Sequence, residues 1–195
     1  MKNIAIFASG SGTNAAKIIT RFHQHPQVRV GLVVTNRPNA GVIRIAEQHQ
    51  LPLLILEKER FFSSDAYLPL LQELKIELIV LAGFLWKVPA ALVKAYPQQI
   101  VNIHPALLPK YGGKGMYGRF VHEAVIAAGE RESGITIHYV DEVYDNGKTI
   151  LQVTCAVLPG DTPDSLAKRV QQLEHEYYPQ VVEDLARSAH PAREG

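Results

Sequence analysis

Several features that would define whole classes of protein are absent from this sequence. Its 195 residues contain one cysteine, Cys155, which excludes an internal disulfide framework and fits a reducing compartment. No apolar run is long enough to cross a membrane, and the N-terminus leads into a strand-like segment rather than a signal peptide. A net charge of +1 gives no overall attraction to nucleic acid or to an anionic membrane. We therefore expect a soluble cytoplasmic protein that binds neither nucleic acid nor membrane.

Glycine and proline are close to their usual shares, at 14 and 12 residues, so the chain is neither collagen-like nor of low complexity. Hydrophobic residues make up 47% of the sequence, which is enough for a sizeable core. No internal repeat or linker divides the chain. We expect one domain over residues 1–195, with a frayed tail over about residues 188–195.

Acidic residues are absent from the first 46 positions, and Glu47 is the first of them. Six cationic residues precede it: Lys2, Lys17, Arg21, Arg29, Arg37 and Arg44. A locally basic segment favours an anionic small ligand. The alternative is a solvated basic face without a ligand, and charge alone does not decide between the two.

Runs that are apolar on both faces indicate strands buried on both sides, as in a parallel sheet. Such runs occupy residues 3–9, 28–35, 51–57, 76–83 and 99–104. Helical patterns alternate with them at residues 13–24, 41–49, 64–75, 88–95 and 119–128. This alternation predicts an α/β fold with an open, mostly parallel Rossmann-like sheet and helices on both faces.

The C-terminal part follows a different pattern. Alternating residues flank Asn146-Gly147, a pair that favours a tight hairpin turn, so we predict an antiparallel C-terminal hairpin. A helix is then predicted to begin with Thr162 as N-cap and Pro163 at its first position. We expect Pro179 to kink or break this helix.

The first strand is followed by a glycine loop, with Gly10 and Gly12 before the first helix. Free N–H groups at a helix start attract an anion, and Thr13 and Asn14 add side-chain donors or cap the helix. The spacing also fits a relaxed dinucleotide fingerprint, but no carboxylate follows the second strand to hold a ribose. A phosphate monoester fits the loop better, and a plain strand-to-helix turn is the alternative.

Asn102 and His104 interrupt the last apolar run two residues apart, so their side chains share one face of a strand. They lie at the carboxyl end, where open α/β sheets bind ligands. An amide beside an imidazole stabilises an oxyanion and handles a proton. Asp141, Glu142 and Asp145 are candidates for a third, proton-accepting partner, and their spacing does not choose among them.

A polar pair buried in a core is the alternative explanation for Asn102 and His104. No His, Cys and carboxylate cluster has the spacing of metal ligands, so we expect no metal. No G-x-S-x-G elbow indicates a serine nucleophile.

Several motifs in order resemble the folate-dependent formyltransferase family: SGSGTN, LAGF, VNIHPALLPKY, GITIHYVDEVYDNG and QQLEHEYYP. The resemblance covers roughly residues 3 to 185. Within the family, the sequence most resembles those members that transfer the formyl group of 10-formyltetrahydrofolate to glycinamide ribonucleotide in purine biosynthesis. It implies that Asn102 and His104 stabilise the oxyanion and that Asp145 manages the proton.

The resemblance also implies two binding sites. Gly12, Thr13 and Asn14 would hold the ribonucleotide phosphate, and Glu174 would contact the amino end of that substrate. The remaining implied residues would bind the folate: Leu85, Trp86, Lys87, Val88, Tyr139, Val140, Asp141, Glu142 and Val143. The expected partners are these small molecules, and the oligomeric state stays open between a monomer and a homodimer.

The sequence departs from the family pattern near the phosphate. Many members carry a phosphate-contacting Arg where this chain has Ser64, and Lys17, Arg21 and Lys114 are candidate replacements. Lys114 lies in a glycine-rich segment, residues 111–118, which is either a lid that reaches an anion or a loose turn.

Other functions fit parts of the sequence. A 10-formyltetrahydrofolate hydrolase and a sugar-nucleotide N-formyltransferase are the nearest alternatives. A methionyl-tRNA formyltransferase would need a further domain and a more basic surface. A non-catalytic nucleotide-binding module would use only the glycine loop, and its binding would survive His104→Ala and Asp145→Asn.

Overall fold

The computed structural model describes residues 1–63 and 65–188. Its strands are β1 (Lys2–Phe7), β2 (Val28–Thr35), β3 (Leu53–Ile55), β4 (Ile76–Leu81), β5 (Ile100–His104), β6 (Glu132–Tyr139) and β7 (Thr149–Ala156). Its helices are α1 (Thr13–Phe22), α2 (Val42–Gln48), α3 (Lys58–Phe62), α4 (Leu68–Glu73), α5 (Ala90–Ala95), α6 (Arg119–Ala127) and α7 (Pro163–Arg187). The short helix α3 was not predicted from the sequence.

All seven strands form one sheet in the order β3-β2-β1-β4-β5-β6-β7. Strands β1 to β5 are parallel, whereas β6 pairs antiparallel with β5, and β7 pairs antiparallel with β6. The predicted fold class is therefore confirmed. The strand order reverses between β1 and β4, so the carboxyl ends of these strands open onto a crevice of the kind that binds ligands in α/β sheets.

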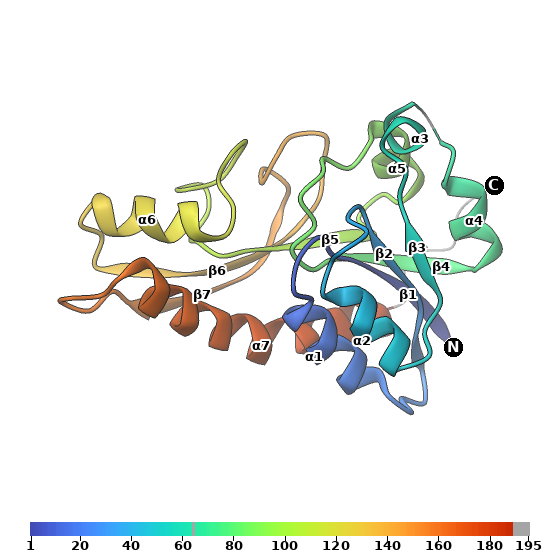
Figure 1. The fold of residues 1–195 in the computed structure, drawn as a ribbon, viewed down its shortest axis with the longest axis horizontal. Helices are drawn as coiled ribbons and strands as arrows, with labels where there is room; N and C mark the ends of the chain where they lie inside the picture. The colour runs from blue at the N-terminus through green and yellow to red at the C-terminus, as the bar shows by residue number, and fades with distance from the viewer. Residues whose placement is uncertain (64, 189–195) are drawn as a thin grey trace.

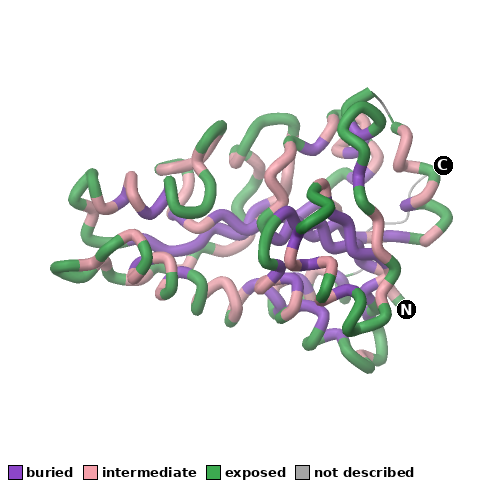
Figure 2. The backbone as a smooth tube through the Cα atoms, in the orientation of Figure 1, coloured by how far each residue is buried: buried purple, intermediate pink, exposed green. Residues whose placement is uncertain are grey.

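Both faces of the parallel strands are covered, as their continuous apolar sequences require. In β1, Ile4 and Ile6 belong to one buried cluster, while Ala5 and Phe7 belong to another. The first cluster contains side chains of α1, α2, α6 and α7, and the second contains side chains of α3, α4 and α5. Figure 1 shows α1, α2 and α7 on one side of the parallel strands and α3 to α5 on the other, and Figure 2 shows the buried backbone between them.

The predicted two-residue turn at Asn146-Gly147 is wrong, although the antiparallel hairpin is present. Strand β6 ends at Tyr139 and β7 begins at Thr149, so a loop over 140–148 joins them. Asp141 folds this loop, because its carboxylate accepts from the Val143 N–H at 2.7 Å and from Asn146 Nδ2 at 3.1 Å. Local side-chain bonding of this kind competes with a tight turn.

Helix α7 begins as predicted but continues through its proline. Thr162 is the N-cap, its side chain accepts from the Ser165 N–H, and Ser165 Oγ accepts from the Thr162 N–H in return. Pro179 is buried inside the helix and does not break it. Burial of this segment against the sheet outweighs the backbone hydrogen bond that proline cannot donate. Of the predicted frayed tail, residues 189–195 lie outside the described residues.

Tyr178 joins α7 to the sheet. Its fully buried hydroxyl lies 2.9 Å from the carbonyl oxygen of Leu81, at the end of β4, and 3.2 Å from that of Val101, near the start of β5. We expect Tyr178→Phe to lower the free energy of unfolding by about 1–2 kcal/mol, because a buried hydrogen bond is lost. Urea unfolding measures this, with Tyr177→Phe as the matched control. An equal loss in both variants would contradict the role assigned to the Tyr178 hydroxyl.

In the described part of the chain, no helix combines the length and the apolar character needed to cross a membrane.

Candidate active site

Asn102 and His104 end β5, and both line a cavity of about 730 Å³. They share a strand face because they are two residues apart. His104 is only 4% exposed, so its imidazole needs hydrogen-bond partners. Its Nε2 lies 2.7 Å from the Tyr111 carbonyl oxygen and therefore donates to it.

His138 on β6 lies directly opposite Asn102 in the antiparallel pair. Its Nδ1 lies 2.8 Å from the Tyr139 carbonyl oxygen, which only accepts, so Nδ1 carries the proton. In the neutral ring Nε2 then accepts from Asn102 Nδ2 at 3.1 Å. One of the two amide hydrogens of Asn102 is thereby fixed, and the other is left for a ligand. His138 was not among the residues predicted for the site, because only the pairing of β6 with β5 brings it there.

Asp145 is the carboxylate that the structure brings to the pair. Its Oδ2 lies 3.7 Å from His104 Nδ1, and its Oδ1 lies 3.7 Å from His138 Nε2. The Gly113 N–H donates to Oδ2 at 2.9 Å. Burial opposes ionisation of Asp145, but contact with His138, the charge of His104 and the Gly113 N–H together hold its pKa below the ordinary value.

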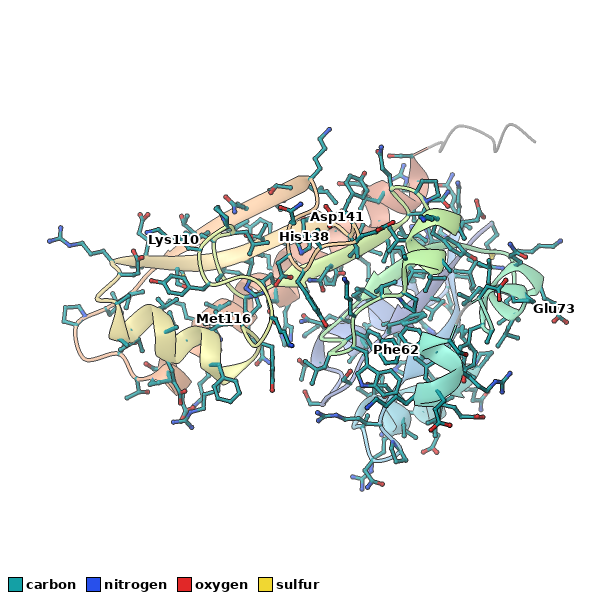
Figure 3. The ribbon with its side chains drawn as sticks, turned by 90° about the horizontal axis from the view of Figure 1, so that it is seen from above. Phe62, Glu73, Lys110, Met116, His138 and Asp141 are labelled. Carbon is teal, nitrogen blue, oxygen red and sulfur yellow. The ribbon has the colours of Figure 1, made fainter. Side chains whose placement is uncertain are left out.

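The other two candidate carboxylates lie elsewhere. Asp141 folds the loop over 140–148, and Glu142 lies 3.9 Å from Lys94 in an exposed ion pair. Figure 3 shows Asp141 and His138 in the upper middle of the molecule, where β6 leads into this loop. Among the three acidic residues that the sequence offered, Asp145 contacts the imidazoles.

The glycine loop forms another wall of the cavity, which residues 9–14 line together. Gly12 is the N-cap of α1 with φ +78°, and a β-carbon there would lie 2.8–2.9 Å from atoms of Ile45 and Val42. Only glycine fits this conformation and this contact. Since no side chain caps α1, its first N–H groups remain available to an anion.

Asn14 and Glu174 bond to each other across the cavity wall. Asn14 Nδ2 donates to Glu174 Oε2 at 2.9 Å, and within the described residues Asn14 Oδ1 is buried without a partner. Burial raises the pKa of the Glu174 carboxyl, and the Asn14 N–H opposes this only in part. Thr13 Oγ1 accepts from Gln171 Nε2 at 3.3 Å, which places Gln171, a residue the sequence analysis missed, beside the loop.

A second, narrow hollow of about 70 Å³ adjoins the cavity. The two share four lining residues: Phe84, Asn102, Tyr144 and Asp145. On one side of this junction is the glycine loop, and on the other are the side chains of Trp86 and Val88 together with polar groups such as Lys87 and Asp141. Two ligands bound in the two hollows would therefore meet at Asn102 and Asp145.

The residues that the resemblance assigns to folate divide into groups. The second hollow is lined by Trp86, Lys87, Val88, Val140, Asp141 and Val143, and Leu85 lines the larger cavity. Tyr139 and Glu142 line neither of these two hollows. Several of the backbone N–H groups are already bonded within the protein: that of Leu85 to Ser9 Oγ, that of Tyr139 to the Lys148 carbonyl, that of Val140 to the Ile100 carbonyl and that of Val143 to Asp141.

The candidate replacements for the missing arginine differ in position. Ser64 itself lies outside the described residues. Arg21 pairs with Glu183 at 2.5 Å, and neither Arg21 nor Lys17 lines the cavity. Lys114 does line it, as does Arg37, which the sequence analysis did not consider for this role.

His122 on α6 also lines the cavity and is 4% exposed, with no partner for Nδ1 among the described residues. Burial, and then the charge of His104, lower its pKa from the ordinary 6.5. At His122 the folded state therefore binds fewer protons than the unfolded state. The contribution of His122 to the free energy of unfolding is complete above pH 6.5, and it is lost as the pH falls through the lower pKa of His122 in the folded state.

We expect urea unfolding at several pH values to show declining stability from about pH 7 to pH 5, with a smaller decline in His122→Asn. Burial also lowers the pKa of His104, so part of the decline in stability should remain in the His122→Asn variant. An equal decline in both proteins would contradict the assignment to His122.

An open α/β sheet with a polar trio and a glycine loop at its carboxyl edge is the arrangement with which α/β proteins of the Rossmann-like class bind their ligands. Within residues 1–63 and 65–188, no group of three or more His, Cys, Asp or Glu side chains is placed to hold a metal ion. A model of the formyl transferase family matches residues 2–182. The chain belongs to the formyl transferase family, as the resemblance implied.

Relatives of known name support this membership. The chain is 42% identical over 187 residues to a chloroplastic phosphoribosylglycinamide formyltransferase of Arabidopsis thaliana, covering 93% of this chain and 64% of that one. It thus spans less than two thirds of this plant relative. It is 35% identical over 190 residues to the phosphoribosylglycinamide formyltransferase of Bacillus subtilis, covering 95% of each. The crystal structure of a glycinamide ribonucleotide transformylase from Geobacillus kaustophilus matches with a TM-score of 0.86 and 38% identity, covering 95% of this chain and 99% of that one.

Proposed function

We propose that this protein transfers the formyl group of 10-formyltetrahydrofolate to the amine of glycinamide ribonucleotide, a step of purine biosynthesis. The observation that carries the proposal is the position of Asn102, His104 and Asp145. They lie where a cavity walled by a glycine loop meets a second hollow that Phe84, Trp86 and Val88 line. A transfer between a phosphorylated amine and a flat, amphipathic folate needs such a junction.

The reaction begins when the amine nitrogen attacks the formyl carbon, and the formyl oxygen becomes an oxyanion. The free amide hydrogen of Asn102 is placed to donate to it. His104 already donates through Nε2 to Tyr111, so a second donation requires a proton on Nδ1, the atom that faces Asp145. Burial lowers the pKa of His104, and the Asp145 carboxylate opposes this only in part. The proton on Nδ1 is favoured once the oxyanion develops beside the ring, and the imidazolium then stabilises that oxyanion.

The attacking nitrogen gains a positive charge and must lose a proton. Asp145 is ionised because its pKa is lowered, and it accepts this proton directly or through a water molecule. When the intermediate collapses, the bond from the formyl carbon to N10 of the folate breaks, and the same proton passes to N10. The products are formylglycinamide ribonucleotide and tetrahydrofolate, with no net gain or loss of protons.

The two hollows support the assignment of the two substrates. Gly12, Thr13 and Asn14 line the larger cavity, where the helix N–H groups suit the phosphate. The buried carboxyl of Glu174 lies beside Asn14 and suits the amino end of the same substrate. Phe84, Trp86 and Val88 give the second hollow the apolar surface that a pterin ring requires.

We also propose that residues 1–195 act as one formyltransferase domain in the cytoplasm, with Cys155 as a free thiol. Homodimer formation stays a prediction, and light scattering after size-exclusion chromatography tests it.

An acceptor comparison tests the proposed function. The initial rate of tetrahydrofolate formation is measured with glycinamide ribonucleotide, with an amino-sugar nucleotide and with no acceptor. The proposal expects rapid turnover with the first alone. An equal rate with and without an acceptor would identify a 10-formyltetrahydrofolate hydrolase. A higher rate with the amino-sugar nucleotide would identify a sugar-nucleotide N-formyltransferase.

A further inference from the structure

The end of β2 carries a cation at the position where dinucleotide-binding folds carry a carboxylate. Arg37 follows this strand and lines the large cavity. Its backbone is held in place, because its N–H donates to Thr35 Oγ1 at 3.3 Å and its carbonyl accepts from the Ala40 N–H at 3.2 Å. A carboxylate here would bind ribose hydroxyls, whereas an arginine here accommodates a phosphate.

Arg37 lies close to the glycine loop through the pairing of β1 with β2. The Ala8 N–H donates to the Val34 carbonyl at 2.9 Å, and Ser9 Oγ donates to Asn36 Oδ1 at 2.6 Å. The residue before the loop and the residue before Arg37 are thus directly bonded. An anion at the N-terminus of α1 is therefore within the same part of the cavity as the segment that carries Arg37.

Lys114 reaches the cavity from another element. It lies between Gly113 and Gly115, both with positive φ, in the segment that also bonds to Asp145. This segment and the glycine loop both line the large cavity. The two cations therefore approach one space from separate parts of the fold.

Their charges are not neutralised within the protein. Arg119, the other Lys or Arg side chain along the cavity wall, pairs with Glu123 at 2.6 Å and with Asp164 at 3.4 Å. In contrast, neither Arg37 nor Lys114 forms an ion pair with any residue in the described ranges. Both residues are exposed, and they give this part of the cavity wall a positive charge that can attract an anion.

We propose that Arg37 and Lys114 together neutralise the substrate phosphate. A phosphate monoester carries between about −1.5 and −2 charges at pH 7, more than the N–H groups of one helix end balance. Arg37 supplies a planar fork for two phosphate oxygens, and Lys114 supplies a point charge from the segment between Gly113 and Gly115. The inference rests on the proposed function, because it identifies the cations that select the phosphorylated acceptor.

The test compares Arg37→Gln, Lys114→Met and the double variant with the unaltered protein and with Lys17→Met. Lys17 is an exposed cation on α1 that does not line the cavity, so it controls for general electrostatics. Each protein is assayed with glycinamide ribonucleotide and with the same acceptor lacking the 5′-phosphate. We expect kcat/KM for the phosphorylated acceptor to fall about 10-fold in each single variant and further in the double variant. With the phosphate-free acceptor, all proteins should agree within about 2-fold.

Calorimetric binding of ribose 5-phosphate gives a readout that needs no turnover. The account expects its affinity to fall in the Arg37 and Lys114 variants and to persist in Lys17→Met. Unchanged affinity, or an equal loss with both acceptors, would overturn the inference while leaving the proposed function intact. Absence of turnover in the unaltered protein would overturn the proposed function, and the binding measurement would still decide the role of the two cations.

Discussion

Asp145→Asn is expected to lower kcat by roughly 10³-fold, within the range found when a positioned acid–base group is removed. The amide keeps the size of the side chain and an oxygen that accepts from the Gly113 N–H. It loses the negative charge that favours a proton on His104 and the ability to take a proton from the attacking amine. Since neither loss affects the glycine loop, the KM for the ribonucleotide should change little. Steady-state kinetics with both substrates measure this.

Asp164→Asn is the matched control, because Asp164 also lines the cavity but its charge is balanced by Arg119 at 3.4 Å. Its kcat should remain close to that of the unaltered protein. If Asp145→Asn retained more than about a tenth of the normal kcat, the proton would take another route and the role of Asp145 would be wrong.

His104→Ala is expected to lower kcat by roughly 10²- to 10³-fold, the loss typical for one oxyanion donor. In the unaltered protein the Tyr111 carbonyl accepts from His104 Nε2, and the truncation removes this hydrogen bond. Thermal unfolding and ribonucleotide binding therefore need to be measured beside the rate, so that a local collapse is separated from lost catalysis. His138→Asn should cost less, because in this arrangement His138 accepts from Asn102 and so orients the amide rather than the oxyanion.

The double variant His104→Ala/Asp145→Asn provides a further check. Because Asp145 also favours the proton through which His104 acts, their effects should be far from additive, with the double variant close to Asp145→Asn alone. Fully additive losses would mean that the two residues act independently, contrary to the proposed mechanism.

Much of the architecture could be predicted from local patterns. Continuous apolar runs follow from burial on both faces, so they locate β1, β2, β4 and β5, and strand periodicity places Asn102 and His104 on one face. The capping box at Thr162 is likewise a local signal, and the structure confirms it. The roles of Asn102, His104 and Asp145 came from the family resemblance, and they stay predictions until the variants are measured.

The remaining features depend on contacts between distant segments. Asn146-Gly147 favours a tight turn on its own, but the Asp141 carboxylate folds the loop differently and presents Asp145 with φ +52°. Pro179 disfavours a helix locally, yet burial of Tyr178 and Val182 beside it keeps α7 continuous. His138 and Arg37 reach the site only through strand order, which local patterns do not specify.

The central claim is that the formyl carbon moves to the acceptor amine and not to water. It is tested most directly with 10-formyltetrahydrofolate labelled with ¹³C in the formyl group, mixed with glycinamide ribonucleotide and the protein and followed by ¹³C NMR. We expect the label to appear as the formamide of formylglycinamide ribonucleotide, in step with tetrahydrofolate, and to stay on the folate when the acceptor is omitted. Label accumulating as free formate, at the same rate with and without the acceptor, would contradict it.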